Sequence, residues 1–192
     1  MIKTENFVQV EIVSAAQLRT WLGKNYAQKE SIWLVTFKKN IPEKYIPHSD
    51  ILDELICFGW IDGIMRKLDD DRVMQLVSPR RVQHWSKTYK DRYAKLESLG
   101  LIEPSGVESV LVSKQNGLWN FMDDVDALIK SDDFIESLKQ HQNALDNFNN
   151  FGASSQRFVL RWIKLAKTLE TRAKRIQQAS ELASKNSKIP GL

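Results

Sequence analysis

The order of apolar and polar positions predicts a small β-sheet in the first part of the chain. Residues 31–38, SIWLVTFK, are apolar on both faces and rich in branched and aromatic side chains. This pattern is typical of a strand in the interior of a sheet. The runs 60–68 and 72–77 flank a short turn of three aspartates and predict an antiparallel hairpin in the same sheet. A shorter β-prone run covers residues 7–13.

Apolar residues recur at helical spacing in three other segments of this part of the chain. One helix is predicted after Ser14, with Leu18, Trp21, Leu22 and Tyr26 on one face. The other two helices are predicted to end at Gly59 and at Gly100, because glycine readily takes the left-handed conformation that closes a helix.

Beyond residue 100 the strand pattern fades and only helices are predicted. These helices begin at Pro104 and continue over residues 124–130, 132–140, 143–150 and 154–166, with a last one from Thr168 to about residue 184. In the last helix, Leu169, Ala173 and Ile176 follow one another at helical spacing, and we expect them to pack inward.

These elements predict an α+β fold with a small mixed or antiparallel sheet. Residues 1–100 form the α/β half, residues 101–184 form an all-helical half packed on it, and residues 185–192 form a flexible tail. No linker rich in glycine, serine or proline separates the halves, so we expect one compact unit.

Composition narrows the class of protein. The chain has 42% hydrophobic and 27% charged residues, one cysteine and a net charge of +4. These values are typical of a globular protein and exclude an internal disulfide framework. No apolar run is long enough for a membrane span, and the start MIKTENFVQVEIV lacks the pattern of a signal peptide. We therefore expect a cytoplasmic protein.

Charge is unevenly distributed along the chain. Residues 80–97 and 157–175 are basic, whereas residues 123–136 are acidic. One interpretation is a set of solvated helix faces that balance one another. The other is that the basic segments bind an anionic partner; for nucleic acid the signal is weak, because no aromatic side chains interleave the basic residues of 157–175.

Two short motifs carry the candidate chemistry. Ser78-Pro79 is predicted to end a strand and start a helical turn, which would place Arg80 and Trp85 beside unpaired backbone N–H groups that attract anions. The second motif, CFGWIDG over residues 57–63, joins a helix to the hairpin. The candidate ligand-binding residues are Trp60, Asp62, Arg80, Trp85, Ser86, Lys87, Arg172 and Arg175, the last two reaching across from the helical half.

No motif for a metal, a cofactor or a known catalytic centre is present. The three histidines lie far apart in the sequence, and the aspartates at 69–71 lack the glycine and glutamate of a calcium loop. There is no P-loop, dinucleotide fingerprint or nucleophile elbow. We expect no cofactor and no metal.

The motifs ICFGWIDG, SPR, HWSK and the late basic segment RWIKLAK-LETRAKRI resemble the bacterial YdeI/OmpD-associated family, whose members are described as bacteriocin-protection proteins. The resemblance extends from WLVTFKK to TRAKRI. It differs at Thr88-Tyr89, where the family has an asparagine after Trp-Ser-Lys, and at Leu169, where the family has proline. The resemblance implies a link to antimicrobial-peptide or envelope-stress resistance and no particular reaction.

Three hypotheses of function follow. The first is a binding protein for an anionic small molecule or a protein partner in a tryptophan-walled cleft between the halves. The second is an enzyme that uses this cleft, with Asp62 or Lys87 transferring a proton. The third is a nucleic-acid or regulatory-partner protein that uses residues 157–175.

Overall fold

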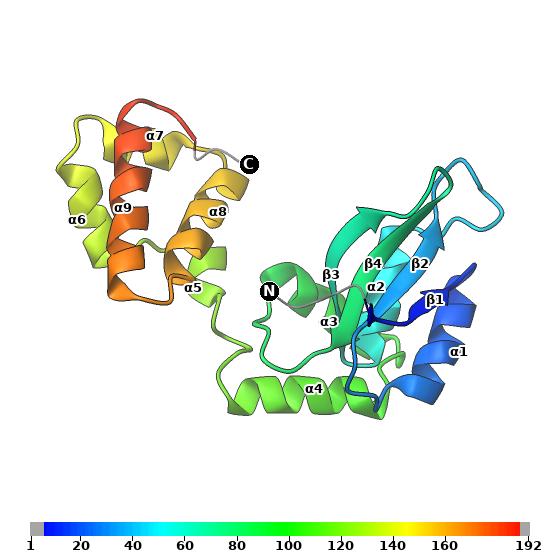
Figure 1. Ribbon diagram of the computed structural model, residues 1–192. Helices are drawn as coiled ribbons and strands as arrows, with labels where there is room; N and C mark the ends of the chain where they lie inside the picture. The colour runs from blue at the N-terminus through cyan, green and yellow to red at the C-terminus, as the bar shows by residue number, and fades with distance from the viewer. Residues whose placement is uncertain (1–5, 189–192) are drawn as a thin grey trace. The chain divides into compact units, whose positions relative to one another are not determined.

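The computed structural model describes residues 6–188. The chain divides into two compact units, one ending at Asn120 and the other beginning at Phe121 (Figure 1). Residues 1–5, where no signal peptide is predicted, and residues 189–192 of the predicted flexible tail lie outside the described residues.

The N-terminal unit combines a four-stranded sheet with four helices among the described residues. Its elements are β1 (Gln9–Glu11), α1 (Ala15–Asn25), β2 (Ile32–Phe37), α2 (His48–Cys57), β3 (Trp60–Lys67), β4 (Arg72–Pro79), α3 (Lys87–Ser98) and α4 (Pro104–Gln115). The strand order is β1-β2-β4-β3, with β1 parallel to β2 and the other pairs antiparallel. The predicted α+β class is confirmed, and the sheet is mixed.

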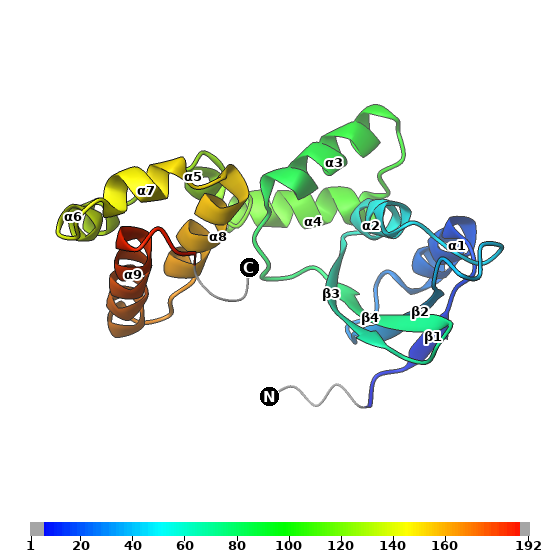
Figure 2. The same ribbon diagram turned by 90° about the horizontal axis from the view of Figure 1, so that it is seen from above.

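Strand β2 lies in the interior of the sheet, as its two-sided apolar pattern predicts. Trp33 and Leu34 are 3% and 0% exposed. Helices α1 and α2 cover one face of the sheet (Figure 2). Ile32 and Leu34 share a core with Leu18, Leu22 and other apolar residues of these helices. Burial of this face stabilises the unit by about 25 cal/mol for each Å² of apolar surface removed from water.

Strands β3 and β4 form the predicted antiparallel hairpin, and the aspartates build its turn. The Asp69 carboxylate accepts hydrogen bonds from the backbone N–H groups of Asp71 and Arg72 at 3.0 and 2.7 Å. The Lys38 ammonium donates to the carbonyl oxygens of Asp69 and Asp70. The acidic cluster is therefore part of a hydrogen-bonded turn.

The prediction that Ser78-Pro79 starts a helical turn is wrong, and the strand that these residues were expected to end includes both of them. Strand β4 continues through Pro79, which lies opposite Trp60 of β3. Strand β2 begins only at Ile32, opposite Val77, so the missing N–H of Pro79 interrupts no ladder on that side. Helix α3 begins only at Lys87.

The predicted glycine stops are confirmed in this unit. Gly59 follows α2 with φ of 73°, and Gly100 follows α3 with φ of 66°. At Gly59 a side chain is excluded twice, because a Cβ atom would also lie 2.8 Å from the carbonyl oxygen of Ser105. The glycine therefore lets the end of α2 approach the start of α4 closely.

Among the described residues, the C-terminal unit contains only helices. They are α5 (Asp123–Asp126), α6 (Asp132–Lys139), α7 (Ala144–Asn150), α8 (Ala153–Lys164) and α9 (Leu169–Ser184). The Thr168 hydroxyl caps α9 as predicted, accepting from the N–H of Thr171 at 3.1 Å. Helix α9 packs against α6, α7 and α8 (Figure 1).

The predicted inward face of α9 is wrong at two of its three positions. Ile176 is buried, but Ala173 is exposed and Leu169 is 87% exposed. The first turns of α9 border a groove of about 380 Å³, whose α6 side presents Asp133 and Glu136 instead of apolar side chains. The core is formed further along the helix, by Ile176, Ala179, Ser180 and Ala183.

Candidate functional site

Arg80 and Trp85 meet at the end of the sheet in the N-terminal unit. Arg80 directly follows β4, and its N–H donates to the carbonyl oxygen of Gly59 at 2.9 Å. Trp85 precedes Ser86, the N-cap of α3, and its N–H donates to the carbonyl oxygen of Leu118 at 3.1 Å. Because Trp85 lies before the helical spiral, its ring can face the same space as Arg80.

The Arg80 guanidinium is enclosed by aromatic rings. Its central carbon lies 4.0 Å from the centroid of Trp85 and 5.1 Å from that of Tyr89. Arg80 is 8% exposed and Trp85 is 1% exposed. Contacts of this kind between a desolvated cation and ring faces stabilise the charge by up to about 2 kcal/mol.

Within the described residues, two nitrogens of Arg80 have no hydrogen-bond partner. Nη1 makes long contacts of 3.5 and 3.3 Å with the carbonyl oxygens of Gln83 and His84. Nε and Nη2 are buried and unpartnered. Burial lowers the pKa of Arg80 to about 10, although Tyr89 and Asp62 act in the opposite direction. The site therefore holds a cation whose charge is not fully compensated.

Asp62 lies in the polar part of the same cluster. Its carboxylate accepts hydrogen bonds from the Tyr89 hydroxyl and, at 3.1 Å, from the Gln75 amide. His48 Nε2 lies 3.8 Å from this carboxylate and 3.1 Å from the Gln75 amide nitrogen. Burial and the hydrogen bond to Asp62 raise the pKa of Tyr89, so its hydroxyl keeps its proton and donates it to Asp62.

The remaining N-terminal candidates are Trp60, Ser86 and Lys87. Trp60 is fully buried, contacts the Trp21 ring edge-on at 5.7 Å and donates to the carbonyl oxygen of Tyr26. Ser86 caps α3 through its backbone position and makes no side-chain cap bond. Lys87 is exposed and pairs with Asp91 at 2.6 Å, so the desolvation that a basic lysine would need is absent.

Arg172 and Arg175 belong to the C-terminal unit and contact residues of that unit. Arg172 binds Asp133 with Nε on Oδ2 and Nη2 on Oδ1, both at 2.8 Å. Arg175 donates to the carbonyl oxygen of Trp162, and its guanidinium lies over the Trp162 ring. Their participation in anion binding at Arg80 stays a prediction.

Several charges of the basic segment 157–175 are paired with the acidic segment 123–136. Lys164 lies 2.6 Å from Asp124, and Arg172 pairs with Asp133. Lys174 pairs with Glu170 of its own helix. This arrangement is the one expected of helix faces that balance one another.

Three residues of the Arg80 cluster were not among the predicted site residues. Tyr89 and Gln75 donate hydrogen bonds to Asp62, and His48 lies beside the Asp62 carboxylate and the Gln75 amide. In the sequence Tyr89 follows Trp85 by four residues, the spacing of neighbours on a helix face, and this spacing was the available signal. Gln75 faces Asp62 through the strand register, in which Asp62 is opposite Val77, two residues from Gln75. No local signal identifies His48.

The fold and the cluster define an α+β protein with a buried, aromatic-walled arginine. Residues 10–109, just over half of the chain, match the family model of the domain of unknown function DUF8412, so the chain belongs to that family. Residues 128–186 match the family described as bacteriocin-protection, YdeI or OmpD-associated, which confirms the resemblance for this part of the chain. The motifs ICFGWIDG, SPR and HWSK lie in the part that matches DUF8412 instead. No curated protein and no solved structure matches the chain.

Two further findings concern the part of the chain that the structure describes. None of its helices has the length and apolarity needed to cross a membrane. Within residues 6–188, no three His, Cys, Asp or Glu side chains form a group that could hold a metal ion.

Proposed function

We propose that the N-terminal unit binds an anionic small molecule through Arg80. The observation that supports this proposal is the pair of unpartnered nitrogens, Nε and Nη2, on a buried guanidinium. An unsatisfied buried donor costs roughly 1–3 kcal/mol, and more when it is charged. A carboxylate or phosphate that accepted from both nitrogens would remove this cost and neutralise the charge.

The geometry of the free nitrogens favours a bidentate ligand. Nε and Nη2 are the two donors on one side of a guanidinium, and they match the spacing of two oxygens of a carboxylate or phosphate. Arg172 of this chain uses the same two nitrogens to bind the Asp133 carboxylate. The Trp85 ring occupies a face of the Arg80 guanidinium, which leaves that edge for the anion.

Access to Arg80 requires movement of the connection between β4 and α3. Residues 80–86 contain no helix or strand, and the backbone bonds that hold them include Arg80 to Gly59 and Trp85 to Leu118. Displacing so short a connection breaks few hydrogen bonds. The anion would therefore reach Nε and Nη2 when this connection moves.

A thermal-shift screen of carboxylate and phosphorylated metabolites tests this proposal, with hits measured by calorimetry. Arg80→Met should weaken binding of a hit at least tenfold, as expected for the loss of charged hydrogen bonds. Arg81→Met is the matched control, because Arg81 is adjacent and exposed and donates to the carbonyl oxygen of Lys29. The proposal fails if no anion stabilises the wild type, or if both variants lose binding equally.

We also propose that the chain contributes to bacterial resistance to bacteriocins or related envelope stress. The support is that residues 128–186 match a family described as bacteriocin-protection proteins. Expression in a bacteriocin-sensitive strain should raise the inhibitory concentration of the bacteriocin. An Arg80→Met variant tested beside the wild type would show whether resistance depends on the anion site, and an unchanged inhibitory concentration for the wild type would reject the role.

A further inference from the structure

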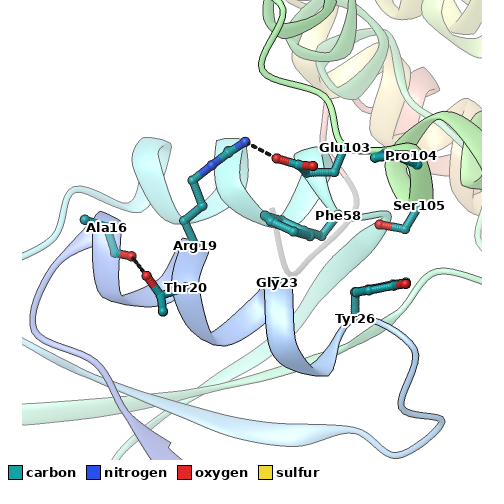
Figure 3. Close-up of a pocket in the computed structure, with 9 residues that line it drawn as sticks. All are labelled: Ala16, Arg19, Thr20, Gly23, Tyr26, Phe58, Glu103, Pro104 and Ser105. Atoms are coloured by element: carbon teal, nitrogen blue, oxygen red, sulfur yellow. Dashed lines mark hydrogen bonds and ion pairs between the residues drawn. The ribbon is translucent and has the colours of Figure 1, made fainter.

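A cavity opens in the N-terminal unit, and its lining residues are separate from the Arg80 cluster. It has a volume of about 550 Å³, within the range typical of small-molecule sites. The cavity lies where the exposed face of α1, the end of α2 and the start of α4 come together (Figure 3). Its lining residues are Ala16, Arg19, Thr20, Gly23, Tyr26, Phe58, Glu103, Pro104 and Ser105.

One end of the cavity carries more negative than positive charge. Arg19 lies 3.0 Å from the Glu54 carboxylate and 2.6 Å from the Glu103 carboxylate. Arg19 also donates to the carbonyl oxygen of Leu101 at 3.0 Å. A single guanidinium therefore serves two carboxylates, and the group keeps one uncompensated negative charge that favours a cation.

The middle of the cavity is apolar and aromatic. The Phe58 ring lies between Arg19 and Ser105, and the Tyr26 ring lies beyond Gly23 (Figure 3). The Arg19 guanidinium contacts the Phe58 ring at 5.3 Å. Ring faces bind planar apolar groups and are attracted to cations. The hydroxyl groups of Tyr26 and Ser105 stand at the other end as hydrogen-bonding groups.

Gly23 keeps the α1 wall of the cavity open. A glycine inside a helix costs about 0.5–1 kcal/mol relative to alanine. Gly23 has no positive φ, and an added Cβ would meet only the Phe58 ring, at an ordinary 3.9 Å. Neither the backbone nor the packing of the fold therefore requires glycine here, whereas a side chain at this position would project toward the cavity.

We infer that this cavity binds a small organic cation with a planar apolar body, an aryl-alkyl amine. The ammonium group lies against Glu103, and the ring lies against Phe58 and Tyr26. A hydroxyl on the far side of the ring would reach Ser105 or Tyr26. This ligand differs in charge from the anion proposed for Arg80, so the two sites are distinguished by the sign of the ligand.

Calorimetric titration of the full chain with three probes of similar shape tests the charge preference. Tyramine carries an ammonium group, para-ethylphenol is neutral and hydroxyphenylpropionate carries a carboxylate. Tyramine should bind at least tenfold more tightly than the other two, because only it compensates the carboxylates. Failure of tyramine to bind, or tighter binding of the carboxylate probe, would overturn the inference.

Two pairs of variants locate the binding. Gly23→Leu fills the cavity and should weaken tyramine at least tenfold, whereas Lys24→Leu adds the same side chain at an adjacent exposed position outside the cavity and should not. Glu103→Gln should weaken tyramine about tenfold and leave para-ethylphenol unchanged, with Glu108→Gln, at an exposed position in the helix that Glu103 precedes, as its control. Unchanged tyramine binding in Gly23→Leu would place the ligand elsewhere and reject the inference, and melting curves of all four variants would show that they are folded.

Discussion

The guanidinium carbon of Arg80 lies 4.0 Å from the centroid of the Trp85 ring, although the two residues are separated by a connection without regular structure. Both side chains are buried, at 8% and 1% exposure. The aromatic contact stabilises the cation but satisfies none of its N–H donors, and Trp85 Nε1 is itself buried without a partner among the described residues. The pair thus combines an aromatic wall with an unsatisfied donor edge, and this edge is the observation that supports the proposed anion site.

The unsatisfied edge predicts how Arg80 affects stability without ligand. Arg80→Met should leave the free energy of unfolding unchanged or raise it by about 1 kcal/mol, because an apolar chain of similar length needs no hydrogen bonds. Trp85→Ala should lower it by about 3–5 kcal/mol, because it removes a fully buried ring. Urea unfolding followed by circular dichroism measures both. A large loss in Arg80→Met would instead make Arg80 a structural residue.

Cys57, the single cysteine, tests how well the core of the N-terminal unit excludes solvent and reagents. Cys57 is 1% exposed, and burial raises the pKa of its thiol to about 11 from 9.0. The higher pKa alone should cut the thiolate fraction roughly a hundredfold near neutral pH, and burial adds to the effect. Labelling by a thiol reagent should therefore be at least a hundredfold slower in buffer than in urea.

The same pKa difference sets the sign of a pH effect. As pH rises from 9 to 11, the unfolded thiol loses its proton before the folded one, so the contribution of Cys57 to stability falls over this interval. Cys57→Ser, which does not titrate there, is the comparison. Rapid labelling of the native protein would contradict the burial of Cys57.

The sequence predicts those parts of the fold that depend on local chemistry. The two-sided apolar run identifies β2, the aspartate turn identifies the hairpin, and Gly59 and Thr168 mark helix ends. Each of these signals acts within a few residues. They agree with the structure because backbone conformation and burial pattern favour the same elements.

The candidate site was only partly predictable, because its contacts join residues that are distant in the sequence. Asp62 and Tyr89 come from β3 and α3, and His48 comes from the start of α2. The end of β4 was predicted two residues too early, because proline interrupts a strand only where that strand is paired on both of its sides. The exposure of Leu169 depends on which side chains of α6 face it, which helical periodicity cannot show.

Ile176 and Leu169 of helix α9 form a matched pair for truncation to alanine, because one side chain is buried and the other is exposed. Ile176→Ala should lower the free energy of unfolding by about 2–5 kcal/mol, because the side chain is 7% exposed in the core of the C-terminal unit. Leu169→Ala should leave it nearly unchanged, because Leu169 is 87% exposed. Thermal melts followed by circular dichroism compare the two. Equal effects would mean that the first turn of α9 packs as the sequence predicted.

The ion pair between Asp133 and Arg172 predicts a loss of stability in acid. The hydrogen bonds from Arg172 lower the pKa of Asp133 to about 2 from 3.8. The folded carboxylate therefore stays ionised where the unfolded one is already protonated, and its contribution is complete above about pH 4 and lost as pH falls toward 2. Because the Asp133 side chain is 50% exposed, solvent screening limits this contribution to roughly 1 kcal/mol.

Asp133→Asn should lower the free energy of unfolding by this amount at pH 7 and leave it unchanged at pH 2, as measured by urea unfolding at each pH. Glu170→Gln, which removes the partner of the largely exposed Lys174, is the control and should leave both curves unchanged. A deficit in Asp133→Asn that persisted at pH 2 would show that the side chain acts through packing and not through its charge.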